Sequence, residues 1–592
     1  MLFRCQAQRW FTVTCLIIAP CFALPATAKA QAPPTAANFL PETTVFFAHI
    51  DKPAELIGTL ENHPVVKHVW EMKPVKQFMR SPQAAMAMLG RGLLEQQLGG
   101  DAITAFKKCM DQGVWLAFDT KTSGVIVLFR SSDEDHLKQT AGKTLKFIST
   151  MAKQDGNKAP FKKIEYRDAV AAEFDGAMIA RRNNWFIITN QPKLAKSVVD
   201  KMIDAPLDSA DSLSGANWFK EAVSQRQPAD LWTAVDVGSV RKLVGDKEPF
   251  LGRTDNPGVE LIFGGLLDLL KNTPVAMGEL NLGDQIDVSI NAPFDGKWAN
   301  ESREFFFGKE LGGFAPQALA PNNMIASLTS YRDIGLWWLS KEDLYAENVI
   351  AQLANADSQL SNIFPGMDFG QDVLGALEPG VQIIVTQNQY GEKYIPDVKI
   401  PAFALVGKLK NPEKLQRRLK IAFQSVIGFA NINLGMNGQP QLEVETETIE
   451  GAKFASAEYF YEDNTEEGLM LFNFAPTIAF QGSHLILSSK RELAVELAGL
   501  IAKREPADNK PTNTSLVLDG DMIHQILVAN RESLIAQNML EEGNTRDDAQ
   551  AQMEIVFEVA DLFKDANLDY SVGAKQMTLD VSVRFDELAT EK

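Results

Sequence analysis

The alternation of apolar and polar positions predicts short strands joined by single amphipathic helices. Strands are expected at residues 45–50 and 113–118, where branched and aromatic residues are concentrated. After the second of these strands, Leu137, Ala141 and Leu145 recur every four positions, which is the spacing of one helix face. The pattern therefore predicts helices whose apolar faces cover a sheet.

The same pattern returns in the second half of the chain. Strands are expected again at residues 324–329 and 380–385, and Leu415, Leu419 and Phe423 repeat the four-residue spacing of a helix. Runs of strands with single covering helices are typical of α+β folds. We predict an α+β protein made of two tandem copies of a similar unit, each with a largely antiparallel sheet covered by helices.

The repeat also predicts where the units begin and end. The first α+β unit is expected at residues 39–305 and the second at residues 319–590. The joining segment, residues 306–318, is rich in glycine and alanine, as linkers often are. Residues 31–38 are expected to form a second linker, which follows a signal peptide at residues 1–30.

The beginning of the chain has the pattern of a secretory signal. Arg4 and Arg9 make it basic, residues 11–24 are mainly apolar, and Ala28-Lys-Ala supplies small residues at a cleavage site. We therefore expect cleavage near Ala30 and export to the periplasm or the cell exterior.

A retained anchor and a lipid on Cys21 are the alternatives to cleavage. The apolar run is shorter than the roughly 20 residues of a membrane-spanning helix, and Pro20 interrupts it. Cleavage would remove Cys5, Cys15 and Cys21 and leave Cys109 as the one cysteine. The mature chain would then form no internal disulfide, and Cys109 is expected to pack as a small apolar residue.

Composition and charge narrow the classes of partner. The chain has 45% hydrophobic residues, which is typical of globular proteins, and a formal net charge of −18. An acidic surface repels nucleic-acid phosphates and anionic lipid headgroups. We therefore expect no nucleic-acid partner and no integral membrane segment in the mature chain.

The start of the first unit resembles a known group of proteins. The chain reads Leu40-Pro-Glu-Thr-Thr-Val-Phe-Phe-Ala-His-Ile-Asp, continues through residues 53–60, and then reads His63-Pro-Val-Val. This is similar to exported bacterial proteins that open with an "LPxDT" strand after the signal peptide and carry a domain of unknown function. The resemblance implies an exported α+β protein and no catalytic residues.

Histidines supply the best candidate for metal chemistry. His49 and Asp51 lie two positions apart on a predicted strand and therefore on one face, and His63 and His68 follow. Imidazole and carboxylate groups suit zinc and other transition metals. No HExxH or paired CxxC spacing accompanies them, and no histidine recurs where the two halves align. A hydrolase or metal-dependent enzyme with a site in the first half only, around His49 and Asp51, is one alternative.

Carboxylates do recur in both halves, at the beginnings of predicted helices. Asp101 and Asp372 form one pair, and Asp236 and Asp519 form another. An aspartate that precedes a helix accepts hydrogen bonds from free backbone N–H groups. We therefore interpret these residues as N-caps and not as catalytic acids.

The function predicted from the sequence is that of an exported, non-enzymatic binding or structural protein of the cell envelope. Its partner would be an envelope protein or a glycan, and no residue is assigned to catalysis, to a cofactor or to a metal. A further alternative is a ligand-binding module that uses a cleft between the halves. Trp337 and Trp338 could line such a groove, although core packing is the favoured interpretation of both.

Overall fold

The computed structural model describes most of the chain after the predicted signal peptide, which lies outside the described residues. The described residues are 35–154, 161–174, 176–204, 209–245, 254–283, 285–364, 366–391, 394–459, 468–504 and 511–586. Contacts divide the chain into two compact units. The first contains the residues up to Leu243 and Thr273–Ala292, and the second contains Val244–Asn272 and Pro293–Asp586.

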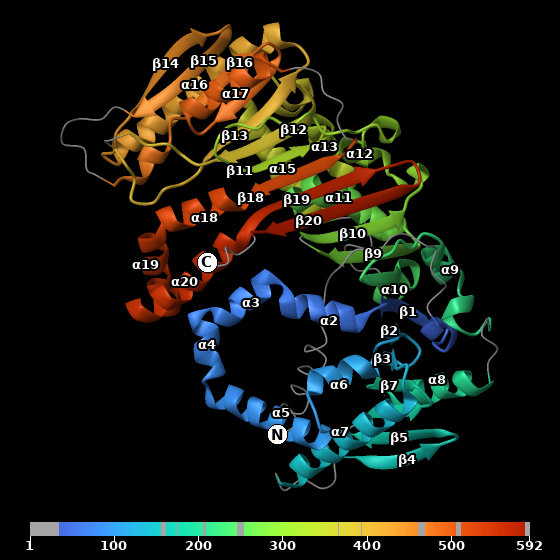
Figure 1. Ribbon diagram of the computed structural model, residues 1–592. Helices are drawn as coiled ribbons and strands as arrows, with labels where there is room; N and C mark the ends of the chain where they lie inside the picture. Colours follow the sequence, from blue (N-terminus) through green and yellow to red (C-terminus); the bar gives the residue numbers. More distant parts are fainter. Residues whose placement is uncertain are drawn as a thin grey trace. The chain divides into compact units, whose positions relative to one another are not determined.

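The strands of the first unit form an antiparallel sheet (Figure 1). They are β1 (Thr44–Ile50), β2 (Val114–Asp119), β3 (Gly124–Arg130), β4 (Lys162–Tyr166), β5 (Ala169–Phe174), β6 (Ala177–Arg182), β7 (Trp185–Thr189), β8 (Leu231–Asp236), β9 (Val275–Leu282) and β10 (Gln285–Pro293). Neighbouring strands follow the order β10–β9–β8–β1–β2–β3–β7–β6–β5–β4.

The strands of the second unit also form an antiparallel sheet. They are β11 (Met324–Ser330), β12 (Leu377–Thr386), β13 (Ala402–Leu409), β14 (Leu442–Ile449), β15 (Ala452–Tyr459), β16 (Thr477–Gln481), β17 (His484–Ser488), β18 (Thr514–Asp519), β19 (Phe563–Val572) and β20 (Gln576–Phe585). Their order is β20–β19–β18–β11–β12–β13–β17–β16–β15–β14. This is the order of the first unit with each strand number raised by ten.

The helices of the first unit include α7 (Glu134–Gln154) and α8 (Pro192–Asp204), which cover opposite faces of its sheet. The others are α2 (Pro53–Asn62), α3 (Pro64–Glu71), α4 (Lys73–Met79), α5 (Pro82–Leu98), α6 (Ala102–Cys109), α9 (Asn217–Ser224) and α10 (Val237–Val244). Ile187 of β7 packs with Leu194 of α8, whereas its neighbour Phe186 packs with Leu137 of α7. Successive strand residues point to opposite faces, so α7 and α8 lie on opposite sides of the sheet. Cys109 is buried in the cluster under α7, as the sequence predicts.

The second sheet is covered in the same way. Its helices are α11 (Pro257–Asn272), α12 (Glu304–Phe307), α13 (Ile334–Leu339), α14 (Lys341–Leu344), α15 (Glu347–Ser361), α16 (Pro412–Met436), α17 (Arg491–Ala502), α18 (Gly520–Ala529), α19 (Arg531–Glu542) and α20 (Arg546–Leu562). Ile486 of β17 packs with Leu493 of α17, and Leu485 packs with Leu415 of α16. The predicted mixture of helices and antiparallel strands is confirmed, and the four-residue apolar spacings do mark α7 and α16.

Helix α11 groups with the second unit, although the first predicted repeat, residues 39–305, contains it. The cause is a buried ion cluster. Arg303 donates from Nε to Glu260 over 2.8 Å and from Nη1 to Asp268 over 2.5 Å, and all three side chains are buried. Breaking such a cluster would leave charges unpaired away from water, so it fixes α11 to residues 300–307.

One predicted helix cap is wrong. Asp101 does cap α6, because its Oδ2 accepts a hydrogen bond from the backbone N–H of Thr104 over 2.7 Å. Asp372 instead lies inside a short π-helical turn, Phe369–Val373, and the cap is Asp368, which accepts from the N–H of Gln371. The sequence pattern located the turn but placed its start four residues too late.

Candidate functional site

His49 lies on β1 between two tryptophans of the neighbouring strands. It is opposite Trp115 of β2 and opposite Trp232 of β8. The imidazole is 4% exposed and stacks on the Trp115 ring, with ring centroids 5.0 Å apart and planes 4° apart. These two aromatic neighbours enclose His49 on the first sheet.

An arginine fixes the protonation of His49. Arg226 donates from Nη2 to Nδ1 of His49 over 3.1 Å, so Nδ1 is an acceptor and the proton is on Nε2. Burial and the adjacent guanidinium both disfavour a second proton and lower the pKa of His49 to about 3. Asp51 is 3.9 Å from Nε2, which is too far for a hydrogen bond. His49 therefore stays neutral at neutral pH.

The predicted metal site is not assembled in the described part of the chain. His63 lies at the junction of α2 and α3, and His68 lies in the last turn of α3. No group of three histidine, cysteine, aspartate or glutamate side chains with the geometry of metal ligands occurs among the described residues. The His49–Asp51 pair thus lacks the third ligand that the metal-dependent alternative requires.

The tryptophan pair of the second unit is committed to packing. The indole N–H of Trp337 donates to the Tyr345 hydroxyl over 2.7 Å, and that of Trp338 donates to Asp357 over 3.1 Å. Trp338 is buried, and Trp337 packs against the cluster around Tyr345. Both polar atoms are already satisfied, which leaves no free donor for a ligand.

The shared aspartates of the second predicted pair, Asp236 and Asp519, are structural. Asp236 accepts from the N–H of Ser239 at the start of α10, and Asp519 accepts from the N–H of Met522 at the start of α18, over 2.8 and 2.9 Å. Both residues are N-caps, as the sequence predicts.

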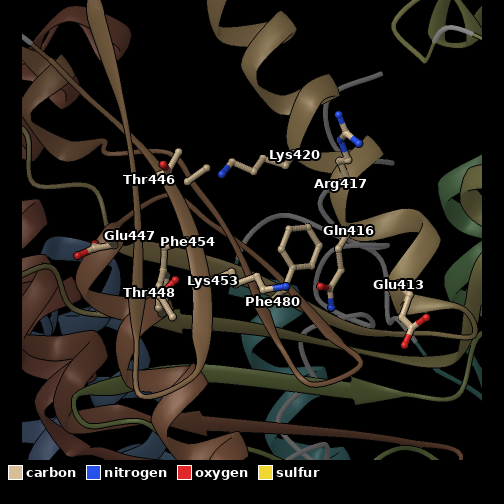
Figure 2. Close-up of a pocket in the computed structure, with 11 residues that line it drawn as sticks. Glu413, Gln416, Arg417, Lys420, Thr446, Glu447, Thr448, Lys453, Phe454 and Phe480 are labelled. Carbon is tan, nitrogen blue, oxygen red and sulfur yellow. The ribbon is translucent and has the colours of Figure 1, made fainter.

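A groove in the second unit is the strongest candidate for a binding site (Figure 2). Helix α16 forms one wall, and the β14–β15 hairpin forms the other. The volume is about 570 Å³, and buried Phe480 and Ala455 lie at its base. The remaining lining residues are Glu413, Gln416, Arg417, Lys420, Thr446, Glu447, Thr448, Lys453 and Phe454.

The strand register explains why the hairpin presents polar groups to the helix. Thr446 is opposite Ala455, and Thr448 is opposite Lys453, so these four residues share one face of the hairpin. Ala455 packs in the cluster that contains Leu415 and Leu419 of α16, which identifies this face as the one that α16 covers. The two threonines and Lys453 therefore line the edge of that helix contact.

Three cations of the groove are without a partner among the described residues. They are Arg417 and Lys420 of α16 and Lys453 of β15, and none makes a hydrogen bond or an ion pair there. In Figure 2, Lys420 extends from the helix toward Thr446. Of the two carboxylates, Glu447 is already bound by Arg491 over 2.6 Å. The groove therefore carries an excess of uncompensated positive charge in a chain whose formal net charge is −18.

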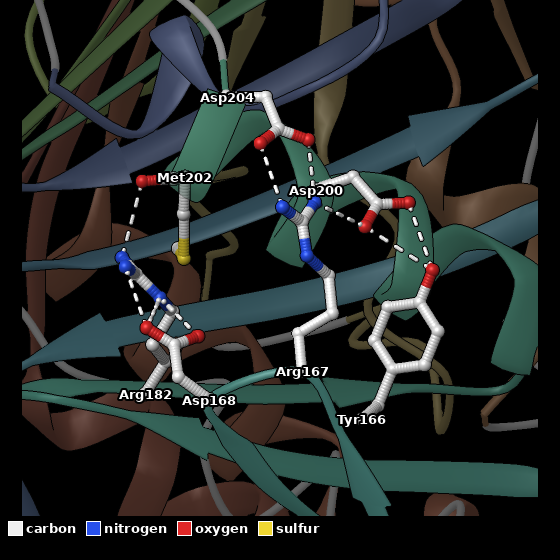
Figure 3. A network of polar contacts seen from close by, with 7 residues as sticks. All are labelled: Tyr166, Arg167, Asp168, Arg182, Asp200, Met202 and Asp204. Atoms are coloured by element: carbon white, nitrogen blue, oxygen red, sulfur yellow. Dashed lines mark hydrogen bonds and ion pairs between the residues drawn. The ribbon is translucent and has the colours of Figure 1, made fainter.

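In the corresponding hairpin of the first unit, β4–β5, the arginine and the aspartate at the turn are both ion-paired (Figure 3). Arg167 at the hairpin turn contacts Asp200 over 3.0 Å and Asp204 over 2.7 Å, both on α8. Arg182 of β6 binds Asp168 over 2.9 Å. These side chains attach the hairpin to its neighbouring helix and leave no comparable free cations in the network.

Sequence reasoning missed the groove residues. Their signal was present as a cluster of lysine and arginine in the first half of a helix, at Lys414, Arg417, Arg418 and Lys420. The helix face that meets the hairpin depends on tertiary packing, so the cluster alone did not indicate a site.

No family model matches the chain, and no curated protein matches it either. Among solved structures, "Structure of crystal form I of TP0453" has 8% sequence identity and a TM-score of 0.24, and covers 50% of this chain and 90% of that chain. "Structure of crystal form III of TP0453" has 8% identity and a TM-score of 0.23, with coverages of 49% and 91%. Likenesses at these scores support no conclusion about fold or function.

Proposed function

We propose that the protein is an exported, non-enzymatic binding protein of the cell envelope, whose groove beside α16 binds an anionic glycan. The observation that carries the proposal is a set of three cations, Arg417, Lys420 and Lys453, that have no partner among the described residues and line the groove together with two threonines. Carboxylate or sulfate groups on a sugar would receive charge-assisted hydrogen bonds from the cations, and ring hydroxyls would pair with the threonines.

The dimensions of the groove suit a small polar ligand. Its volume of about 570 Å³ falls within the roughly 300–1,000 Å³ of ordinary ligand pockets. Gln416 at the wall donates to the Gly482 carbonyl over 2.8 Å, so its amide is held in place beside the cations. An acidic oligosaccharide matches this combination of charge, hydroxyl groups and open access better than an apolar ligand does.

A binding role is favoured over catalysis by the carboxylates of the groove. General acid–base reactions at sugars use two carboxyl groups that are free to exchange protons. Here Arg491 occupies Glu447, and Glu413 is the other carboxylate of the lining. The groove thus offers cations that can bind an anion. Of its two carboxylates, Glu413 is the one without an ion pair among the described residues, whereas acid–base catalysis at sugars needs two.

Export is part of the proposal and is supported by the sequence. The basic start, the apolar run and Ala28-Lys-Ala form the pattern of a cleaved signal, and the "LPxDT"-type opening at Leu40 resembles exported bacterial proteins. None of the helices in the described ranges is long and apolar enough to cross a membrane.

We further propose that the two units are tandem copies of one ancestral unit. The shared order of ten strands supports this, because unrelated sheets seldom share so long a pairing order. Gly113, directly before β2, and Gly380, within the matching strand β12, have similar backbone angles, at φ 116° and φ 111°. Arg167 and Glu450 likewise have φ 54° and φ 48° at the matching hairpin turns.

A thermal-shift comparison tests the binding proposal on the chain from Gln31 onward. We expect an acidic oligosaccharide such as oligogalacturonate to raise the unfolding midpoint, and its neutral methyl ester to have little effect. Lys420→Gln with Lys453→Gln should abolish the shift. Lys163→Gln, at an exposed lysine of the first unit's hairpin, should leave it unchanged.

Equal shifts with the acidic and neutral sugars would contradict the role of charge. Shifts that persist in the Lys420→Gln, Lys453→Gln variant would place the ligand outside this groove. The absence of a shift with acidic sugars, together with a shift caused by inorganic phosphate, would replace the glycan with a phosphorylated ligand.

A further inference from the structure

Helix α16 has a second apolar face that the fold does not cover. Its buried face carries Leu415, Leu419, Ala422 and Ile427, which pack on the sheet. A different set of large apolar residues is exposed along the helix: Ile421 by 47%, Phe429 by 67%, Ile432 by 62% and Met436 by 82%. At 3.6 residues per turn, these four residues fall on the side of the helix opposite the buried Ile427. We call them the outer stripe.

The fold does not require this outer stripe. Helix α7 occupies the matching place in the first unit, where Leu137 packs on the sheet as Leu415 does. Ile148 is the one large apolar residue among the exposed positions described in α7, and it is 39% exposed. The outer stripe is therefore a property of α16 itself.

The charged residues of α16 all lie in its first half. The first half carries Lys414, Arg417, Arg418 and Lys420 against Glu413 alone, and no charged residue occurs from Ile421 to Met436. Lys414 and Arg418 make no ion pair among the described residues, and both are exposed. A cationic segment thus continues directly into the exposed apolar segment.

The size of the outer stripe argues against a protein partner. Residues 421–436 extend over about 24 Å at 1.5 Å per residue, and a helix is about 10 Å wide, which gives roughly 240 Å². A stable protein interface needs about 800 Å² on each partner.

A lipid surface can accept an apolar patch of this size, because no large area of a folded partner has to be buried against it. Its headgroups and acyl chains also suit the cationic and the apolar half of α16, respectively. Apolar side chains enter the boundary between headgroups and acyl chains, while lysine and arginine approach the lipid phosphates. No described helix is suited to crossing a membrane, which agrees with a helix that lies along the surface. We propose that α16 docks the protein on an anionic lipid surface through the outer stripe together with Lys414 and Arg418.

The inference is independent of the groove, because Lys414, Arg418 and the outer stripe do not line it. It modifies the expectation from whole-chain charge, which predicts repulsion from anionic lipids. Electrostatic interactions fall off within about 10 Å at moderate salt, so the cations of α16 act locally despite the net charge of the whole chain.

Flotation with vesicles tests the proposal on the chain from Gln31 onward, which lacks the predicted signal peptide. We expect the protein to float with vesicles of phosphatidylcholine and phosphatidylglycerol and to stay unbound with phosphatidylcholine alone. Phe429→Ser with Ile432→Ser should reduce binding at least tenfold, and Lys414→Gln with Arg418→Gln should reduce it and weaken its salt dependence.

Two controls separate docking from misfolding and from groove binding. Leu540→Ser replaces a still more exposed leucine of α19, at 86% exposure, and should bind vesicles as the unmodified chain does. Lys420→Gln with Lys453→Gln alters the groove and should still float. Thermal unfolding of the outer-stripe variant should match that of the unmodified chain, because both replaced side chains are mostly exposed.

The proposal is overturned if the unmodified chain does not float with the anionic vesicles. It is also overturned if the outer-stripe variant floats as well as the unmodified chain. If sedimentation shows a dimer that Phe429→Ser with Ile432→Ser dissociates, a second copy covers the outer stripe and the lipid proposal is wrong.

Discussion

At His49, burial and the neighbouring guanidinium of Arg226 both lower the pKa of the imidazole. Trp115 stacks on one side, Arg226 occupies Nδ1, and the ring has almost no contact with water. The neutral form is therefore the one compatible with the folded chain, and its protonation must be coupled to unfolding.

Stability should depend on pH through His49. The pKa is about 3 in the folded chain and 6.5 when the residue is unperturbed, so below pH 6.5 the unfolded state binds the extra proton. The contribution of His49 to the free energy of unfolding is fully present above pH 6.5. It decreases as the pH falls toward 3, by up to about 1.4 kcal/mol per pH unit. Denaturant unfolding at several pH values should show a shallower decline in His49→Gln than in the unmodified chain.

His68→Gln is the matched control, since it removes a histidine from α3 that is not buried. It should retain the original pH dependence. If His49→Gln and the unmodified chain lose stability in parallel between pH 6.5 and 4, the account of a buried neutral imidazole is wrong.

At the scale of elements, the close contact of α11 with the phenylalanines of α12 depends on glycine. A Cβ atom at Gly265 would lie 2.3 Å from ring carbons of Phe306, which is closer than such atoms approach. Phe306 is buried and its ring also contacts Tyr570, so it has little room to move. Glycine is therefore needed here for space and not for backbone conformation.

Gly265→Ala should lower the free energy of unfolding by about 1–3 kcal/mol, the usual cost of overpacking a core. Gly428→Ala in α16 is the comparison, because no atom lies within 4 Å of its added Cβ. There the better helix propensity of alanine should raise the free energy by up to about 1 kcal/mol. Equal changes in the free energy of unfolding of the two variants, measured with denaturant, would contradict this account. They would show that Phe306 moves aside for the added methyl group.

Elements were predictable from the sequence where the apolar period was regular. The spacing of Leu137 and Ala141 in α7, and of Leu415 and Leu419 in α16, reports directly on the buried helix face. The groove was not predictable, because Lys420 and Lys453 are brought together by the packing of α16 on β15. The π-helical turn around Asp372 was also missed, since an aspartate before an apolar run has the same pattern whether it caps the turn or lies within it.

At the scale of the whole molecule, the sequence predicts two similar halves, and contacts assign one segment differently from the predicted boundaries. Glu260 and Asp268 of α11 hold Arg303, and Phe305, Phe306 and Phe307 pack in the cluster that contains Tyr570. A boundary at residues 306–318 follows composition, whereas the packing follows these buried groups. Glycine and alanine content in a linker carries no information about such contacts.

Two fragments of the second unit should differ in whether they fold, depending on whether they include α11 and the three phenylalanines. A fragment of residues 319–586 lacks three buried phenylalanines, each of which typically contributes about 3–5 kcal/mol, against a total stability of about 5–15 kcal/mol. We expect it to remain unfolded by circular dichroism. A fragment of residues 254–586 retains α11 and the phenylalanines and should unfold cooperatively. Cooperative unfolding of the shorter fragment with the same midpoint would favour the boundary at residues 306–318.

The central claim is that the groove beside α16 binds an anionic glycan through Lys420 and Lys453. The most direct measurement is calorimetric titration of the chain from Gln31 onward with an acidic oligosaccharide at low and moderate salt. We predict saturable binding that weakens as salt rises and is lost in Lys420→Gln with Lys453→Gln, but not in Lys163→Gln. Binding that is unchanged by the groove variant, or no heat of binding at low salt, would contradict the claim.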